Sequence, residues 1–215
     1  MVFDFNISHL AILLLPLIFA ITIHEAAHAF MAYKYGDNTA FMFGRMSLNP
    51  LKHIDILGTI IIPMILFLLG GFIFGFAKPV PINEAKLRTN LAIFWVSVAG
   101  PIANFAQALI WAIILKLLLY FKYYLVYFTA PLILMAKYGI QINILLMVFN
   151  LIPILPLDGG RALASILPWE LKIKYLKISP YGIYIIFILL MLGIFNKIII
   201  PIYSLLVNAI YFLIS

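Results

Sequence analysis

Apolar runs of roughly membrane-spanning length recur along almost the whole chain, and they constrain its fold more than any other feature. About 20 apolar residues suffice for a transmembrane helix. Of the 215 residues, 66% are hydrophobic and only 10% are charged, which excludes an ordinary soluble domain. We expect an all-α polytopic membrane protein that forms a single domain over residues 1–215. The apolar runs cover residues 9–35, 54–76, 91–119, 142–157 and 181–214, and predict a bundle of about five or six membrane segments.

The charged residues fit the same class of protein. The formal net charge is +7, but the Lys and Arg residues are scattered singly through short loops, as at the ends of membrane helices. Nucleic-acid binding would require a basic stripe, so we expect no nucleic-acid partner. The chain contains no cysteine, which excludes disulfides, thiolate metal ligands and cysteine nucleophiles.

One group of ionisable residues, His24-Glu25-Ala26-Ala27-His28, lies inside the first apolar run. Ionisable side chains are rare and costly at membrane depth, so this cluster indicates a function. On a helix, positions i and i+4 share a face, and the two imidazoles can therefore bind one metal ion. Glu25 is placed beside them, as expected for a general base that acts on water. A chance match to so short a pattern is the alternative, and its apolar surroundings argue against it.

A catalytic zinc site of this kind requires a third protein ligand and one open position. Asp158 is the strongest candidate, because it closes an apolar segment, follows Pro153 and Pro156 and precedes two glycines. A loop carboxylate at a membrane exit is the alternative for this residue. His53 is a possible ligand, but we interpret it as an interfacial residue. The remaining carboxylates are interpreted as surface or helix-cap residues: Asp4, Asp37, Asp55, Glu84 and Glu170.

Three separated motifs make the chain similar to the site-2 protease family of intramembrane zinc metalloproteases. They are the HExxH segment at residues 24–28, Ala-Gly-Pro-Ile-Ala-Asn at 99–104, and Asn-Leu-Ile-Pro-Ile-Leu-Pro-Leu-Asp-Gly-Gly at 150–160, and they occur in the family's order. Residues 43–50 and 75–83 resemble a small prokaryotic branch that has no PDZ or CBS domain. The likeness covers roughly residues 10–165.

The resemblance implies a zinc-dependent metalloendopeptidase that hydrolyses a peptide bond within or near a transmembrane helix of a substrate protein. It implies one Zn²⁺ ion bound by His24, His28 and Asp158, with Glu25 as the catalytic base. Two imidazoles and a carboxylate also suit zinc chemically. The catalytic core would occupy about residues 9–165, with C-terminal helices at about 180–215. A transmembrane protein substrate and the lipid bilayer are the expected partners, and the oligomeric state is left open.

A helical substrate must unwind before its peptide bonds can be hydrolysed, so the protein must offer replacement backbone partners. The alternation of residues 39–48 predicts a short membrane-associated strand that could pair with an extended substrate. Asn150 is a candidate for contact with the substrate backbone or the developing oxyanion, and interhelical packing is its alternative. We expect Asn104 to join helices. Residues 77–83 form a loop stiffened by two prolines.

Two other function classes use similar residues. An ion-coupled transporter or proton channel also buries His, Glu and Asp, but the sequence shows no repeated halves, and its buried ionisable groups suit one metal site. A metal-dependent assembly factor would need the three ligands but would have no use for Glu25. The variant Glu25→Gln therefore separates an enzyme from a scaffold.

Charge and geometry together predict the topology. The two parts of the metal site can meet only if the first and fourth runs cross the membrane in the same direction, so one intervening run must either fail to cross or be joined by an extra span. We predict that residues 54–76 re-enter, which places ten of the 14 basic residues on one side. A short extra crossing at 123–136 is the alternative. We expect the plasma membrane, an outside N-terminus and an active site nearer the cytoplasmic face.

Overall fold

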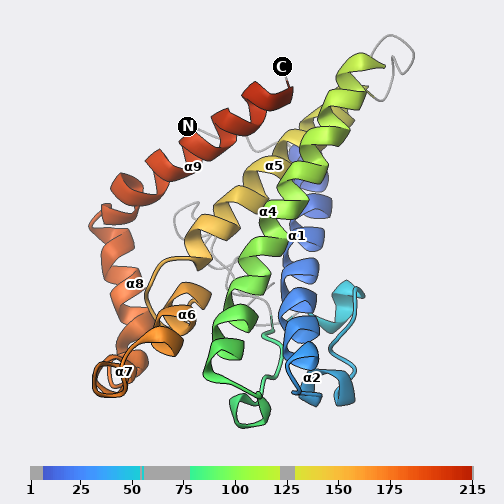
Figure 1. Ribbon diagram of the computed structural model, residues 1–215. Coiled ribbons are helices and arrows are strands. Elements are labelled where there is room, and N and C mark those ends of the chain that lie inside the picture. The colour runs from blue at the N-terminus through green and yellow to red at the C-terminus, as the bar shows by residue number, and fades with distance from the viewer. Residues whose placement is uncertain (1–6, 54, 56–77, 122–128, 215) are drawn as a thin grey trace.

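The computed structural model describes residues 7–53, 55, 78–121 and 129–214, and all regular structure in these ranges is helical (Figure 1). Five stretches are long and apolar enough to span a membrane. This confirms the predicted all-α membrane bundle. The five stretches are Ala11–Lys34, Leu91–Tyr120, Thr129–Asn150, Trp169–Met191 and Ile194–Ile214.

Three long helices form the centre of the molecule: α1 (Ile7–Lys34), α4 (Asn90–Tyr120) and α5 (Thr129–Asn150). In Figure 1, α1 and α5 run downward and α4 runs upward between them, and each of the three packs against the other two. Alanines with fully buried side chains, such as Ala20 and Ala108, lie in these helices and allow their backbones to approach closely.

The fourth apolar segment has different boundaries from those predicted. Residues 142–157 were expected to form it, but α5 begins at Thr129, so residues 129–136 are its first turns and not a separate crossing. The polar side chains of Lys137 and Gln141 disguised this part of the helix in the sequence. α5 ends at Asn150, and Asp158 begins a new helix, α6 (Asp158–Ile166). The two prolines between them lack the N–H groups needed to continue a helix.

The predicted strand at residues 39–48 is wrong. Thr39–Met42 forms a short helix, α2, and the described residues contain no strand. Gly44 has φ 63°, and it ends α2 with the hydrogen bonds Gly44 N–H to Phe41 O and Arg45 N–H to Ala40 O. A glycine in the left-handed region favours this helix ending. The run is too short for its alternation to distinguish a strand from a helical turn.

The C-terminal part of the chain folds around the central helices. α7 (Trp169–Leu176), η4 (Ser179–Tyr181) and α8 (Gly182–Met191) follow α6, and a bend at Gly193 (φ 67°) leads to α9 (Ile194–Ile214). α9 packs against α4 and α5. The main hydrophobic core lies between these helices and contains buried residues such as Ala112, Ile140, Ile144, Phe195 and Val207.

The predicted re-entrant segment, residues 54–76, lies outside the described residues. The residues on either side of it are described: the Lys78 N–H donates to the His53 carbonyl at 3.0 Å. Two short 3₁₀ helices, η1 (Pro50–Lys52) and η3 (Glu84–Lys86), flank this contact. The two described ends of the segment therefore meet on one side of the bundle. α1 and α5 run in the same direction, as the metal site requires (Figure 1).

Candidate metal centre

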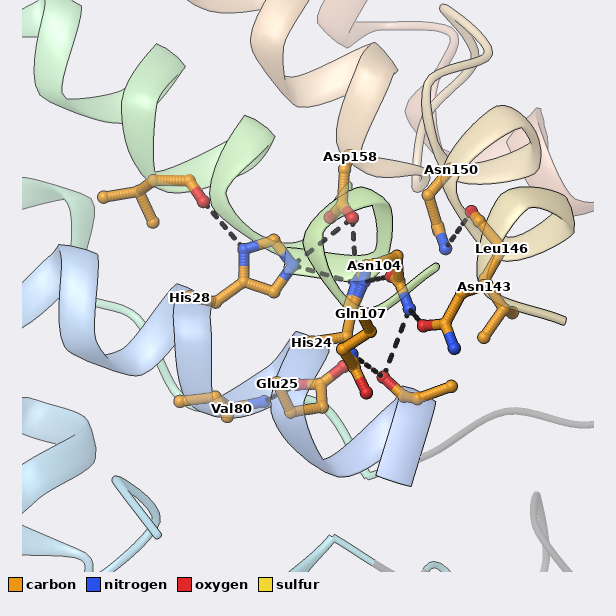
Figure 2. Close-up of polar contacts among 12 residues, drawn as sticks. His24, Glu25, His28, Val80, Asn104, Gln107, Asn143, Leu146, Asn150 and Asp158 are labelled. Atoms are coloured by element: carbon orange, nitrogen blue, oxygen red, sulfur yellow. Dashed lines mark hydrogen bonds and ion pairs between the residues drawn. The ribbon is translucent and has the colours of Figure 1, made fainter. Parts of the chain in front are cut away.

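Three predicted ligands from two distant parts of the chain, His24, His28 and Asp158, point toward one another (Figure 2). The Nε2 atoms of His24 and His28 are 3.0 Å apart. Asp158 Oδ2 lies 3.1 Å from His24 Nε2 and 3.3 Å from His28 Nε2. Among the described residues, no other three His, Asp or Glu side chains converge in this way.

Helix geometry brings each ligand to this point. His24 and His28 lie one turn apart on the same face of α1, and both are about as buried as core residues. Asp158 reaches them because α6 begins inside the bundle. The backbone of α6 packs tightly under the preceding loop: a Cβ at Gly159 would lie 2.2 Å from the Leu151 carbonyl oxygen, so that position requires glycine.

A glycine in α4 leaves space for the two imidazoles. A Cβ at Gly100 would lie 2.4 Å from His28 Nε2 and 2.5 Å from His24 Cε1. Such contacts are far inside van der Waals distance, so any larger residue would displace both rings. Gly100 is followed by Pro101, which is fully buried inside α4. The Gly-Pro pair of the second motif is therefore part of the site's packing.

Both imidazoles are oriented through their other ring nitrogen. His28 Nδ1 donates to the Val96 carbonyl at 2.7 Å, and His24 Nδ1 donates to Asn104 Oδ1. A hydrogen bond of this kind fixes the tautomer and directs the Nε2 lone pair toward a metal. Two carbonyl oxygens, one from the backbone and one from a side chain, thus fix the orientation of both imidazoles.

The orientation of Asn104 is itself fixed by a buried hydrogen-bond network. Its side-chain amide donates to Asn143 Oδ1 at 2.9 Å and to the Ala20 carbonyl at 3.3 Å. The Asn143 amide donates to the Gly139 carbonyl at 2.8 Å. Asn104 does join three helices, as predicted, but it also holds His24. Neither this second role nor the participation of Asn143 was predicted, because the partners are 39 to 84 residues apart.

The three ligand atoms fit a zinc ion. A tetrahedral zinc with ligand distances of about 2.0–2.2 Å separates its ligand atoms by roughly 3.3 Å, close to the spacings observed here. With both Nδ1 atoms acting as donors, two nitrogen lone pairs and a carboxylate oxygen face one another. Asp158 Oδ2 is buried and has no hydrogen-bond donor among the described residues. A cation is the natural partner for three such acceptors.

Glu25, the predicted general base, lies beside these ligands on the wall of the same cavity. One of its oxygens, Oε2, accepts a hydrogen bond from the Val80 backbone N–H at 2.9 Å. Val80 belongs to the proline-stiffened loop after the second apolar run. The structure therefore places Val80, which follows residues 54–76 in the chain, directly against Glu25. The sequence did not predict this contact.

The cavity has a volume of about 620 Å³ and a mainly apolar lining. Its walls come from α1, the segment 79–87, α4, the end of α5, the start of α6 and α8. Asn150 also lines the cavity, while its amide donates to the Leu146 carbonyl of its own helix at 3.0 Å. The predicted contact of Asn150 with a substrate remains a prediction.

Two residues that the sequence placed in exposed or interfacial positions are buried. Asp37 is fully buried and accepts hydrogen bonds from the Thr39 and Asn83 N–H groups at 2.9 and 2.7 Å. His53 is also buried, and its Nε2 contacts the Ser47 carbonyl at 2.8 Å. Burial raises the pKa of the Asp37 carboxyl, but a hydrogen bond from the Thr39 hydroxyl, the two backbone hydrogen bonds and the charge of Lys86 lower that pKa below its ordinary value.

Comparisons with known proteins agree on one family. Residues 122–193 match the model of "Peptidase family M50". The chain is 39% identical to "Putative zinc metalloprotease YwhC" of Bacillus subtilis over 188 residues, which are 86% of this chain and 82% of that protein. It is 28% identical to "Putative zinc metalloprotease Rip2" of Mycolicibacterium smegmatis over 178 residues, which are 83% of this chain and 66% of that protein. No solved structure matches the chain.

Proposed function

The chain belongs to peptidase family M50, the site-2 protease family, and from this premise we propose that His24, His28 and Asp158 bind the zinc ion and that Glu25 is the catalytic base. The resemblance found in the sequence is thereby confirmed at the level of the family. The protein is an intramembrane zinc metalloprotease with several membrane-spanning helices. Membership of a peptidase family favours this function over the transporter alternative.

The proposed roles follow from the geometry of the residues. When bound, a zinc ion supplies a Lewis acid that polarises the scissile carbonyl and lowers the pKa of water to about 7. Glu25 takes a proton from the attacking water and returns it to the leaving amine. His24 and His28 keep their Nε2 lone pairs directed at the ion because Asn104 and the Val96 carbonyl hold their Nδ1 atoms.

The proposed substrate is a segment of a transmembrane protein. The apolar side chains of α8 and of the end of α5 suit the side chains of a membrane helix, while the few polar groups gather near Glu25 and Asp158. A substrate needs free peptide groups at that point, so we propose that it enters the cavity locally unwound. The Asn150 side chain lies on the wall where it would contact the substrate backbone.

We place the protein in the plasma membrane with this site nearer the cytoplasmic face. The support is the distribution of basic residues: the lower end of the bundle in Figure 1 carries Lys34 at the end of α1, Arg45 after α2, Lys86 in η3, Arg88 before α4 and Lys172 in α7. Cytoplasmic loops of membrane proteins are enriched in Lys and Arg.

One observation carries the proposed roles: three acceptor atoms converge within 4.8 Å of one another, with a carboxylate beside them. The test compares purified Glu25→Gln, Asp158→Ala and the exposed control Glu170→Gln for zinc content and for cleavage of a membrane-protein substrate. We expect Asp158→Ala to lose zinc, and Glu25→Gln to keep zinc and lose cleavage. Cleavage by Glu25→Gln at the wild-type rate would refute the role of Glu25, and full zinc content in Asp158→Ala would refute the ligand set.

A further inference from the structure

A short extended segment, Lys78–Asn83, crosses α1 beside the metal centre, and we call it the strap. Pro79 and Pro81 have no backbone N–H, so within residues 79–81 only Val80 can donate a backbone hydrogen bond. A residue that precedes proline is restricted to extended backbone, which prevents Val80 from forming a local helical turn. Its N–H is therefore directed to a partner elsewhere, and that partner is Glu25 Oε2 at 2.9 Å.

The side chain of Val80 holds this N–H in place. Val80 is 6% exposed and packs in a small apolar cluster with Ala29 of α1, Ala40 of α2 and Met46. Ala29 follows Glu25 by four residues, so both lie on the same face of α1. The strap thus contacts one helix face twice: through a side chain at Ala29 and through a backbone N–H one turn earlier at Glu25.

Both ends of the strap are hydrogen-bonded to the segment that follows α1. Arg45 Nη2 donates to the carbonyls of Lys78 and Pro79, at 2.7 and 3.4 Å. At the other end, the Asn83 N–H donates to Asp37 Oδ2 at 2.7 Å. The position of Val80 along α1 is therefore fixed from both sides.

We propose that the backbone N–H of Val80 is a positioning group that holds one oxygen of Glu25, so that the other oxygen faces the metal centre. The inference rests on the proposed role of Glu25 as the catalytic base. A carboxylate on a long side chain has several rotamers, and a donor on one oxygen selects among them. Proton transfer depends on a correctly placed base, so the loss of this donor should lower kcat more than it changes KM.

The test removes the N–H without removing the extended backbone. Val80→Pro deletes the donor, and its matched control, Val80→Ala, trims the side chain but keeps the donor. We expect kcat of Val80→Pro to be roughly ten- to hundredfold below that of Val80→Ala, with KM within about twofold and equal zinc content. Equal kcat values for the two variants would overturn the proposal.

A double-mutant cycle shows whether the effect passes through Glu25. In the Glu25→Asp background the carboxylate is shorter by one methylene and should no longer reach the strap, so the kcat ratio between Val80→Pro and Val80→Ala should approach one. An unchanged ratio in this background would assign the effect to general disruption of the strap and overturn the proposal.

A second variant keeps the inference testable if Val80→Pro does not fold. Arg45→Met releases the carbonyls of Lys78 and Pro79, and Lys52→Met is its control, because Lys52 donates to Gly44 and not to the strap. We expect only Arg45→Met to lower kcat while zinc is retained. A wild-type kcat in Arg45→Met would overturn the proposed positioning role. Active Glu25→Gln would refute the role of Glu25 as the base. Inactive Glu25→Gln together with equal kcat values for the two Val80 variants would refute only the positioning role of Val80.

Discussion

At the scale of single residues, the proposed metal centre depends on groups other than its three proposed ligands. Asn104 and the Val96 carbonyl determine which nitrogen of each imidazole is free, and Gly100 provides the space in which the rings lie. Such outer partners commonly affect metal affinity almost as strongly as the ligands do. Two substitutions in α4 separate the orienting effect from the steric one.

Asn104→Leu retains the size of the side chain but removes the acceptor from His24 Nδ1. We expect the affinity for zinc to fall roughly 10- to 100-fold, because His24 loses its fixed tautomer and ring orientation. Competition with a metal chelator measures this change. Gln107→Leu, one turn further along α4 and also buried, is the control and should retain wild-type affinity. Unchanged affinity in Asn104→Leu would show that the hydrogen bond does not orient the ligand.

Gly100→Ala adds a methyl group 2.4 Å from His28 Nε2. Overpacking of this kind costs about 1–3 kcal/mol, and here the imidazoles must absorb it, so zinc binding should weaken roughly ten- to hundredfold. Gly139→Ala is a control for overpacking that does not press on the imidazoles: its Cβ would lie 2.3 Å from Trp111 Cδ2, and its carbonyl remains the acceptor for Asn143. We expect both variants to lose thermal stability but only Gly100→Ala to lose zinc during dialysis. Zinc loss in both variants would indicate a general packing effect.

At the scale of elements, short irregular segments position the site as much as the long helices do. The seven residues between α5 and α6 bring Asp158 to the depth of His24, and α2 with its glycine ending brings Arg45 to the strap. Irregular backbone is tolerated at membrane depth where it lines a cavity, and Pro156 and Leu157 do so here. The buried carboxylate of Asp37 links α2 to the strap and gives a prediction about pH.

The hydrogen bonds to Asp37 should make the free energy of unfolding depend on pH. Because the pKa of this carboxyl is lower in the folded state than the ordinary value of 3.8, its stabilisation is complete above that value and is lost as the pH falls toward the folded pKa. Asp37→Asn can accept from only one of the Thr39 and Asn83 N–H groups. We expect it to lower the free energy of unfolding by about 1–3 kcal/mol at pH 7.

Thermal unfolding in detergent at pH 7 and below pH 4 measures this effect. The difference between wild-type protein and Asp37→Asn should shrink at the lower pH, because the Asp37 carboxyl of the unfolded wild-type chain, which has the higher pKa, then binds a proton and unfolding becomes more favourable. Glu170→Gln, on the exposed surface of α7, should differ little from wild type at either pH. A difference between wild type and Asp37→Asn that grows with acid would contradict the sign of the pKa shift.

At the scale of the whole molecule, the direction of the helices decides whether the metal site can form. α1 and α5 are parallel, with α4 antiparallel between them (Figure 1). The hydrogen bond between Lys78 and His53 joins the two described ends that flank residues 54–76. Together these features favour the predicted topology, in which residues 54–76 re-enter and His53 and Lys78 lie on the same side of the membrane.

Cysteine labelling tests this topology in a chain that has no cysteine of its own. Ser47→Cys and Asn83→Cys should both react with a membrane-impermeant reagent only from the cytoplasmic side. Tyr120→Cys, exposed at the opposite end of α4, should react only from the outside. Reaction of Ser47→Cys and Asn83→Cys from opposite faces would exclude the arrangement, and reaction of all three from the same face would exclude the predicted orientation of α4.

Local sequence alone determined the membrane class, the helical fold and the pairing of His24 with His28. These features depend on hydrophobicity and on the 3.6-residue period, which act between neighbours in the chain. The motif that contains Asp158 was also visible, but its place at the start of α6 was not, because α5 ends eight residues earlier. Periodicity misread residues 39–48 for a related reason: a glycine-ended helical turn and a short strand look alike over so few residues.

Only the tertiary structure brought Asn104 to His24, buried Asp37 and placed Val80 against Glu25. Each of these contacts joins groups on different elements, across separations as large as 80 residues. Their formation depends on how helices pack and which backbone groups remain unpaired inside the bundle, and no local pattern specifies either. The buried polar groups must still find partners, since an unsatisfied one is costly at this depth. This need for hydrogen-bond partners, which arises only once the helices are packed, accounts for the contacts of Asn104, Asp37 and Val80.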